Sequence, residues 1–375
     1  MKFSTIALIG ISIFTCASCS QDVEIVEESQ GQLKELSFEN VGLKFMEPAV
    51  SGNESNTRRR VHSTRNDGRF QYYDWDVNDP LAIISPECPE GNNKGVYLVQ
   101  SFNYATIGLT KQQGSIKYNV DKENDIHRIV AGYPAGKVEM TSFAGFNAEY
   151  VEGDFKATID GTQSATISES ADENGYYTIA DWKNAIFAGF WADTPYNLMA
   201  GGTYIPVFPI FTQLELDMEI PEDNIEINSI RVKPQALVGG AVKDVAVCGD
   251  ATGHMKGYAG GEVVFETFIA GDATTNQILT LNVKDSKTMQ MGDKLRASVF
   301  FFPCGDTDKT SQLAEERTNV DFKIQVIVDY KQNGEEKHSR VILDKVPVFL
   351  QGVNNVNLGK IGGNGTASTK KFTFS

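Results

Sequence analysis

Apolar and polar residues alternate along most of the chain from about residue 36 onward. The clearest case is TQLELDMEI at residues 212–220, in which the apolar side chains share one parity and the polar side chains the other. A period of two is typical of a half-buried antiparallel strand whose polar face meets solvent. Residues 279–283 and 322–330 repeat the pattern, and Asn333-Gly334 then predicts a tight hairpin turn into a strand at 340–343.

These short strands, together with 34 glycines spread along the chain, predict an all-β fold built from sandwiches. Two segments depart from the period of two. Residues 181–191 place Trp182, Ile186 and Phe190 four apart, which favours a short helix or a crossing connection, and residues 306–319 are compatible with another helical turn. Residues 191–204, with their proline and glycines, form the best boundary between an N-terminal and a C-terminal half.

The first residues, MKFSTIALIGISIFTCASC, combine one lysine, an apolar run and small residues. This pattern predicts a signal peptide at residues 1–18, too short to span a membrane as a mature helix. The pair Cys16 and Cys19 therefore lacks the folded frame that redox or zinc chemistry needs. The segment resembles a bacterial lipoprotein signal, which implies a lipid such as palmitate on Cys19. The alternative is an ordinary signal whose cysteines are incidental.

Removal of the signal leaves Cys88, Cys248 and Cys304 as unmodified thiols. Three separated cysteines form at most one disulfide, so a hydrophobic core must stabilise the fold, and 375 residues suffice for two domains. The formal net charge of −15 argues against a nucleic-acid partner and against a polybasic membrane contact. The lipid, rather than charge, would attach the protein to a membrane.

The motifs of common enzymes and metal sites do not occur in the sequence. The four histidines, His62, His127, His254 and His338, lie far apart and lack neighbouring ligands at metal-binding spacing. No phosphate-binding glycine loop follows a predicted strand, and no nucleophile elbow occurs. We therefore expect no catalytic residues, no metal and no cofactor.

The two ends of the chain are distinctive. The predicted first strand spans residues 36–45. Its apolar side chains lie at even positions at first (Leu36 and Phe38) and at odd positions afterwards (Val41, Leu43 and Phe45), which indicates a bulge or two short strands. An acidic stretch surrounds it, and a cluster of arginines follows: Arg58, Arg59, Arg60, Arg65 and Arg69. At the other end, the linker-like residues 362–369 precede Phe372 and Phe374, which share one face of an extended chain.

FQYYDWDVNDPLAI at residues 70–83 and YIPVFPIFTQLEL at residues 204–216 resemble segments of the fimbrillin family, the pilus subunits of Bacteroides-type bacteria. The second segment differs from the family in having Ile-Phe where histidine is common. The resemblance implies two tandem transthyretin-like (Greek-key) β-sandwich domains with few short helices, at residues 66–203 and 204–375. It also implies a lipid-anchored precursor in the outer membrane that matures into a cell-surface fimbrium serving adhesion.

In that family an arginine-specific protease cuts after the first strand, the strand leaves, and a strand donated by another subunit takes its place. The resemblance implies cleavage at Arg65, with Arg60 and Arg69 as alternates, and residues 19–65 as the propeptide. Partners would be other copies of this chain or related pilins. The donor-strand candidates lie in the tail, about residues 355–375, and are Val356, Leu358, Phe372 and Phe374.

Three alternatives stay open. The tail could instead complete its own domain's sheet. The arginine cluster could be only a solvated loop. The whole protein could be a monomeric surface lipoprotein that binds a glycan or another ligand.

Overall fold

The computed structural model describes residues 31–39, 41–45, 78–102, 107–147, 150–201, 204–258, 263–271, 274–303, 319–349 and 353–361. Strands dominate these residues and form four sheets, which confirms the predicted all-β sandwich class. The α-helix found in these ranges, α1 (Pro195–Ala200), begins after Thr194, whose side chain accepts the amide of Asn197. Among the described residues no helix has the length and apolar character needed to cross a membrane.

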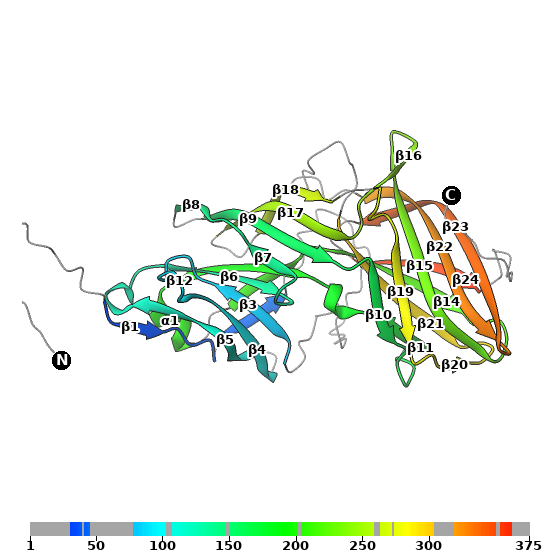
Figure 1. Ribbon diagram of the computed structural model, residues 1–375, viewed down its shortest axis with the longest axis horizontal. Helices are drawn as coiled ribbons and strands as arrows, with labels where there is room; N and C mark the ends of the chain where they lie inside the picture. The colour runs from blue at the N-terminus through cyan, green and yellow to red at the C-terminus, as the bar shows by residue number, and fades with distance from the viewer. Residues whose placement is uncertain are drawn as a thin grey trace, which may run out of the picture.

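An eight-stranded sheet occupies one end of the molecule (Figure 1). Its strands, in spatial order, are β1 (Leu33–Glu35), β5 (Ile107–Asn119), β4 (Asn93–Phe102), β3 (Pro80–Ile84), β6 (His127–Tyr133), β12 (Phe187–Asp193), β13 (Tyr204–Pro209) and β2 (Gly42–Phe45). A five-stranded sheet contacts it through β7 (Val138–Met140). The other strands of this second sheet are β8 (Ala144–Asn147), β9 (Tyr150–Ile159), β17 (Gly249–Tyr258) and β18 (Val263–Ala270).

The other end of the molecule is a sandwich of two sheets (Figure 1). The seven-stranded sheet contains β10 (Thr162–Thr166), β19 (Leu279–Lys284), β15 (Ile225–Val238), β22 (Asn319–Gln332) and β23 (Glu335–Phe349), with β16 (Ala241–Asp244) and β20 (Thr288–Met289) beside β15. The four-stranded sheet contains β11 (Tyr176–Ala180), β21 (Lys294–Phe301), β14 (Thr212–Glu219) and β24 (Val353–Lys360). Phe301 and Phe322, one from each sheet, meet edge to face with their ring centroids 6.3 Å apart.

A row of aromatic rings joins the cores of the two ends. Phe187 on β12 contacts Phe211, which in turn contacts Phe300 on β21, with ring centroids 5.2 and 5.4 Å apart. Tyr133 and Trp182 extend the row at its two ends. The buried apolar side chains therefore form one continuous core.

Strand pairing crosses the predicted boundary after residue 203 in both directions. β10 and β11 precede it, yet they pair in parallel with β19 and β21. β13 follows it, yet β13 pairs with β12 and β2 at the N-terminal end. The sheets thus do not divide where the chain was expected to divide, and the domain ranges 66–203 and 204–375 stay a prediction.

The predicted strands at 212–220, 279–283, 322–330 and 340–343 are confirmed as β14, β19, β22 and part of β23. Asn333 and Gly334 adopt positive φ angles of 50° and 84° in the hairpin turn, as expected. At residues 181–191, where a short helix or a crossing connection was predicted, no α-helix forms: a 3₁₀ turn, η2 (Trp182–Asn184), precedes the start of β12, which pairs with β6 and β13. A second 3₁₀ turn is η1 (Val120–Lys122), and residues 306–318 lie outside the described residues.

Candidate functional site

The N-terminal segment, residues 31–39 and 41–45, occupies both edges of the eight-stranded sheet. β1 pairs antiparallel with β5 at one edge, and β2 pairs in parallel with β13 at the other edge. The strand predicted at 36–45 is confirmed only in part, because β2 covers residues 42–45 while β1 ends at Glu35, before the predicted range, and the switch in parity falls in the connection between them. A single segment thus closes a sheet that would otherwise end at β5 and β13.

Three apolar side chains fix the N-terminal segment in the core. Leu36, Phe38 and Val41 lie between β1 and β2 and are each at most 1% exposed. The amide of Leu36 donates to the carbonyl of Ile116 at 2.8 Å, and the rings of Phe38 and Tyr97 form a T-shaped pair with their centroids 5.0 Å apart. At about 1.5–3 kcal/mol for each buried side chain, these three contribute roughly 5–9 kcal/mol as an upper estimate.

Polar contacts of the N-terminal segment lie at the surface. Lys34 donates to Glu123 at 2.7 Å, and Lys111 donates to Glu35 at 2.6 Å. The hydrogen bond from Lys34 lowers the pKa of Glu123 and raises the pKa of Lys34. Because exposed ion pairs contribute little, the buried apolar side chains hold the segment in place.

The expected processing residues lie outside the described residues. Cys19, Arg60, Arg65 and Arg69 all belong to residues 1–30 or 46–77. The arginines fall in the connection between the end of β2 at Phe45 and the start of β3 at Pro80. Cleavage there would cut the covalent link between the N-terminal segment and the rest of the sheet.

The donor-strand candidates divide into two groups. Val356 and Leu358 lie on β24, are 7% and 4% exposed, and fill the chain's own core beside β14. In this structure they therefore follow the rival interpretation, in which the tail completes its own sheet. Phe372 and Phe374 lie outside the described residues, so a donor role for them stays a prediction.

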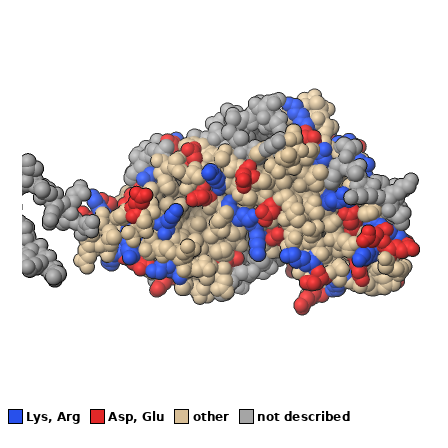
Figure 2. Space-filling model, in the orientation of Figure 1, with Lys and Arg blue, Asp and Glu red and all other residues tan. Residues whose placement is uncertain are grey.

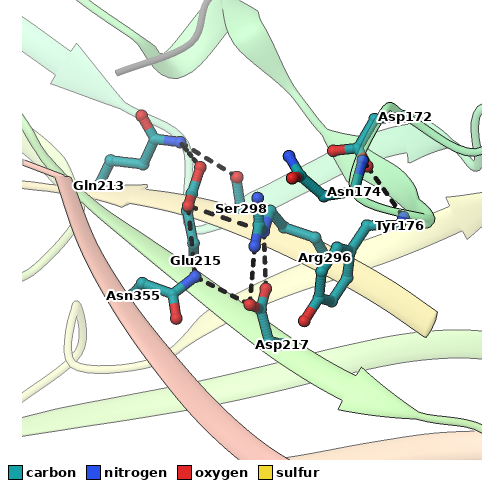
Figure 3. Close-up of polar contacts among 9 residues, drawn as sticks. All are labelled: Asp172, Asn174, Tyr176, Gln213, Glu215, Asp217, Arg296, Ser298 and Asn355. Carbon is teal, nitrogen blue, oxygen red and sulfur yellow. Dashed lines mark hydrogen bonds and ion pairs between the residues drawn. The ribbon is translucent and has the colours of Figure 1, made fainter. Parts of the chain in front are cut away.

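A buried polar cluster lies on β14, where the alternation predicted a solvent-facing side (Figure 3). That prediction is wrong: Gln213, Glu215 and Asp217 are all buried. Arg296 on β21 donates two hydrogen bonds to Asp217, at 2.7 and 2.8 Å, and these raise the pKa of Arg296. Glu215 lies 3.8 Å from the same guanidinium. Burial on both faces is possible because opposite charges are paired.

The polar cluster connects the strands of the four-stranded sheet. Asn355 on β24 donates to Asp217 at 3.0 Å, and the ring of Tyr176 on β11 lies 4.3 Å from the Arg296 guanidinium (Figure 3). Tyr176 is itself positioned by a turn in which Asp172 accepts its amide at 2.9 Å. The sequence held one signal of this cluster, namely an arginine inside the apolar strand KLRASVFF. The cluster ties β24 to its own sheet.

A second polar group lies on the seven-stranded sheet, on the face opposite the core. Asp329 accepts hydrogen bonds from Arg231, with both nitrogen–oxygen distances 2.9 Å, and from Ser229 at 2.7 Å. His338 also contacts this carboxylate. Burial opposes ionisation, but these hydrogen bonds outweigh it and lower the pKa of Asp329.

Two cysteines of the described residues, Cys88 and Cys248, are buried free thiols. Cys88 Sγ lies 3.8 Å from His127 Nδ1, but both side chains are buried, and burial raises the pKa of the Cys88 thiol. Cys248 is also a buried free thiol, and burial raises its pKa to about 11. Buried thiols with raised pKa values are poor nucleophiles. In the ranges given above, no group of three or more His, Cys, Asp or Glu side chains could hold a metal ion.

An apolar groove of about 350 Å³ opens between β7 and the outer side of the eight-stranded sheet. Its lining includes Ile84, Val96, Val138 and Met140, with Lys94 and Glu139 as its charged members. A groove of this size and lining is suited to a small apolar ligand.

Across the visible face of the molecule, acidic and basic side chains are interspersed (Figure 2).

Comparisons with known proteins give structural likenesses only. No family model matches the chain, and no curated protein matches it. Among solved structures, a candidate cell adhesion protein of Bacteroides fragilis has 13% sequence identity and a TM-score of 0.45, over 91% of this chain and 99% of its own. One of Bacteroides ovatus has 11% identity and a TM-score of 0.41, over 88% and 95%. One of Bacteroides uniformis has 11% identity and a TM-score of 0.33, over 79% and 92%.

Proposed function

We propose that this protein is a structural pilus subunit, exported as a lipoprotein precursor, cleaved after an arginine and polymerised by strand exchange to serve adhesion at the cell surface. The observation that carries the proposal is the N-terminal segment, which closes both edges of one sheet and buries Leu36, Phe38 and Val41. The lipid on Cys19 and the adhesion role rest on the sequence and its resemblance to the fimbrillins.

Loss of the N-terminal segment would have two consequences. The outer backbone groups of β5 and β13 would lose their partners, which makes each edge a template for a new strand. The pockets of Leu36, Phe38 and Val41 would expose apolar surface equivalent to roughly 5–9 kcal/mol. Both changes favour a replacement strand from another subunit, and with the covalent link cut, exchange becomes irreversible once the freed segment diffuses away.

Limited proteolysis tests the proposal. Residues 20–375 are digested with an arginine-specific protease, and the products are followed by mass spectrometry and by electrophoresis without boiling. We expect loss of one N-terminal fragment and a ladder of detergent-resistant oligomers. Arg65→Lys keeps the charge but removes the cleavage site, so it should block both the loss of the N-terminal fragment and the formation of oligomers. Arg60→Lys and Arg69→Lys should block neither. A cleaved chain that stays a stable monomer would contradict the proposal.

The apolar groove favours a second candidate function, a monomeric surface lipoprotein that binds an apolar ligand. The two functions predict different results of cleavage. A pilus subunit should form oligomers after cleavage, whereas a ligand-binding monomer needs neither cleavage nor assembly. Val96→Trp would fill the groove while leaving the N-terminal segment untouched. Loss of ligand binding with unchanged assembly would show that the groove serves a separate role.

A further inference from the structure

Three large apolar side chains are exposed at the end of the molecule where the described chain begins. Leu33 on β1 is 41% exposed, Val120 at the start of η1 is 38% exposed, and Ile126 just before β6 is 41% exposed. β1 lies at the end opposite the sandwich of the seven-stranded and four-stranded sheets (Figure 1). We call these three residues the apolar tip.

Backbone pairing places Leu33 beside the start of η1. Leu33 is the partner of Asn119 across β1 and β5. The amide of Val120 donates to the carbonyl of Gln32, the residue before Leu33, at 3.0 Å. Residues that lie far apart in the sequence therefore meet at one place on the surface.

The turn that follows η1 keeps Ile126 in the same region. The amide of Glu123 donates to the carbonyl of Val120 at 3.2 Å, and the amide of Asp125 donates to the carbonyl of Lys122 at 3.1 Å. These two bonds, each three residues back along the chain, close residues 120–125 into a compact turn. Ile126 follows that turn directly, so the apolar tip is one small surface rather than three isolated positions.

Charged side chains beside the apolar tip are largely paired with one another. Lys34 lies 2.7 Å from Glu123, and Lys122 lies 3.2 Å from Asp125. Asp121 adds a further negative charge, and the whole chain has a formal net charge of −15. An anionic surface would therefore not be attracted to this end of the molecule by charge. Whatever covers the tip must bind it through apolar contact.

The chain that precedes the described residues connects this end of the molecule to Cys19. Gly31, the first described residue, lies beside Asn119 and Asp121, because a Cβ atom at its position would be 3.4 and 3.5 Å from their side-chain oxygens. The 12 residues from Cys19 to Gly31 span at most about 40 Å when fully extended. A lipid on Cys19 would thus hold the apolar tip close to the membrane surface.

We propose that the apolar tip is a membrane-contact surface of the anchored precursor, in which Leu33, Val120 and Ile126 enter the interface of a phospholipid bilayer. The inference rests on the lipid on Cys19 in the proposed function. The lipid supplies attachment, and the apolar tip fixes the orientation of the attached protein, because apolar side chains are stabilised at the boundary between headgroups and acyl chains. Cleavage would divide this surface, since Leu33 belongs to the N-terminal segment, whereas Val120 and Ile126 stay with the processed subunit.

Hydrogen exchange on vesicles tests the inference. Residues 19–375 carrying Cys304→Ser are coupled through Cys19 to a maleimide-bearing lipid in phosphatidylcholine vesicles, so that the attachment is supplied chemically. Amide exchange of residues 119–126 is compared with that of the same chain in solution with Cys19 blocked. We expect exchange at least about threefold slower on the vesicles, and equally slow in about 0.5 M salt, because apolar contact is not screened.

Two triple variants separate contact at the apolar tip from mere closeness to the membrane. Leu33→Ser, Val120→Ser and Ile126→Ser together should return the exchange to its rate in solution. The matched control replaces three exposed apolar residues of the C-terminal sandwich, at 42–68% exposure, by serine: Val242, Met291 and Ile342. This control should keep the slow exchange. Exchange of β14 and β21 in each variant reports whether the fold is intact.

Several outcomes would overturn the inference. These are equal exchange of the tip on vesicles and in solution, equal loss in the two triple variants, and slow exchange in solution that grows with protein concentration, which would show that a second copy covers the tip. The proposed function would survive each of them, because strand exchange does not depend on this contact. Conversely, a chain that fails to assemble after arginine-specific cleavage would contradict the proposed function and leave the vesicle result unchanged.

Discussion

Asp217 and Arg296 form a two-hydrogen-bond ion pair on neighbouring strands of the four-stranded sheet, with side chains only 8% and 10% exposed. The pair lies between Tyr176 on one side and Asn355 on the other, so strands from distant parts of the sequence meet at it. We infer that the pair stabilises the C-terminal end of the molecule, because each buried charge is neutralised by the opposite charge beside it.

Removing one member of this pair should be strongly destabilising. Arg296→Met would leave the Asp217 carboxylate buried without its counter-charge, at a cost of about 3–5 kcal/mol in the free energy of unfolding. Lys345→Met, which removes an exposed partner of Asp321, should cost less than about 1 kcal/mol. Urea unfolding of both variants checks the difference, and similar losses would contradict the structural role given to Arg296.

The polar cluster also shows where reasoning from the sequence failed. The alternation in residues 212–220 predicted the strand correctly, and its apolar side chains do face the core. It could not show that Arg296 pairs opposite Asp217, because that contact depends on how β21 and β14 come together in register. Alternating polar residues indicate a solvent-exposed face of a strand only when the neighbouring strand does not place a buried, oppositely charged side chain opposite them.

Residues 181–191 illustrate a second limit. Trp182, Ile186 and Phe190 occur at helical spacing, and Ile186 and Phe190 are buried, yet residues 187–191 are strand and only residues 182–184 form a 3₁₀ turn. Pairing of β12 with β6 and β13 on its two sides outweighs the local spacing. The hairpin at Asn333 and Gly334 was predictable, by contrast, because its signal is local. For the candidate site, the sequence predicted β2 within residues 36–45, but it predicted neither β1 at residues 33–35 nor the placement of the two strands at opposite edges of one sheet.

Phe38 should be the strongest anchor of the N-terminal segment. Phe38→Ala removes a ring that is 1% exposed, so the free energy of unfolding of the uncleaved chain should fall by about 3–5 kcal/mol. Leu33→Ala, at a position 41% exposed, should change it by less than about 1 kcal/mol. After cleavage, the Phe38→Ala fragment should also dissociate faster, measured by size-exclusion chromatography. Equal dissociation rates for the two variants would argue against an apolar anchor.

Stability should depend on the ionisation of Asp329 at acid pH. Its pKa is lowered in the folded protein, so its contribution is complete above the ordinary value of 3.8 and is lost as the pH falls through the lower folded value. Asp329→Asn should therefore be less stable than wild type at neutral pH, and the gap should narrow below about pH 3.8. Asp344→Asn, 85% exposed, is the control. A gap that stays constant in urea unfolding down to about pH 3 would contradict this assignment.

The buried thiols should be unreactive in the native protein. With a pKa of about 11, only about one Cys248 thiol in a thousand is ionised at pH 8. In residues 20–375 carrying Cys304→Ser, we expect slow labelling by a disulfide reagent in buffer and rapid labelling of Cys88 and Cys248 in urea. Fast labelling without denaturant would contradict the burial of these two thiols in the structure.

A disulfide lock on the N-terminal segment tests the central claim most directly. Glu35 and Lys117 face each other across β1 and β5, at a position suited to a disulfide, so Glu35→Cys with Lys117→Cys should bond the segment to its sheet. Oligomers are then counted after arginine-specific cleavage, with and without a reducing agent. We predict that the oxidised chain is cut yet stays monomeric, and that reduction releases the fragment and starts assembly. Equal assembly in the oxidised state would contradict the claim that this segment must leave.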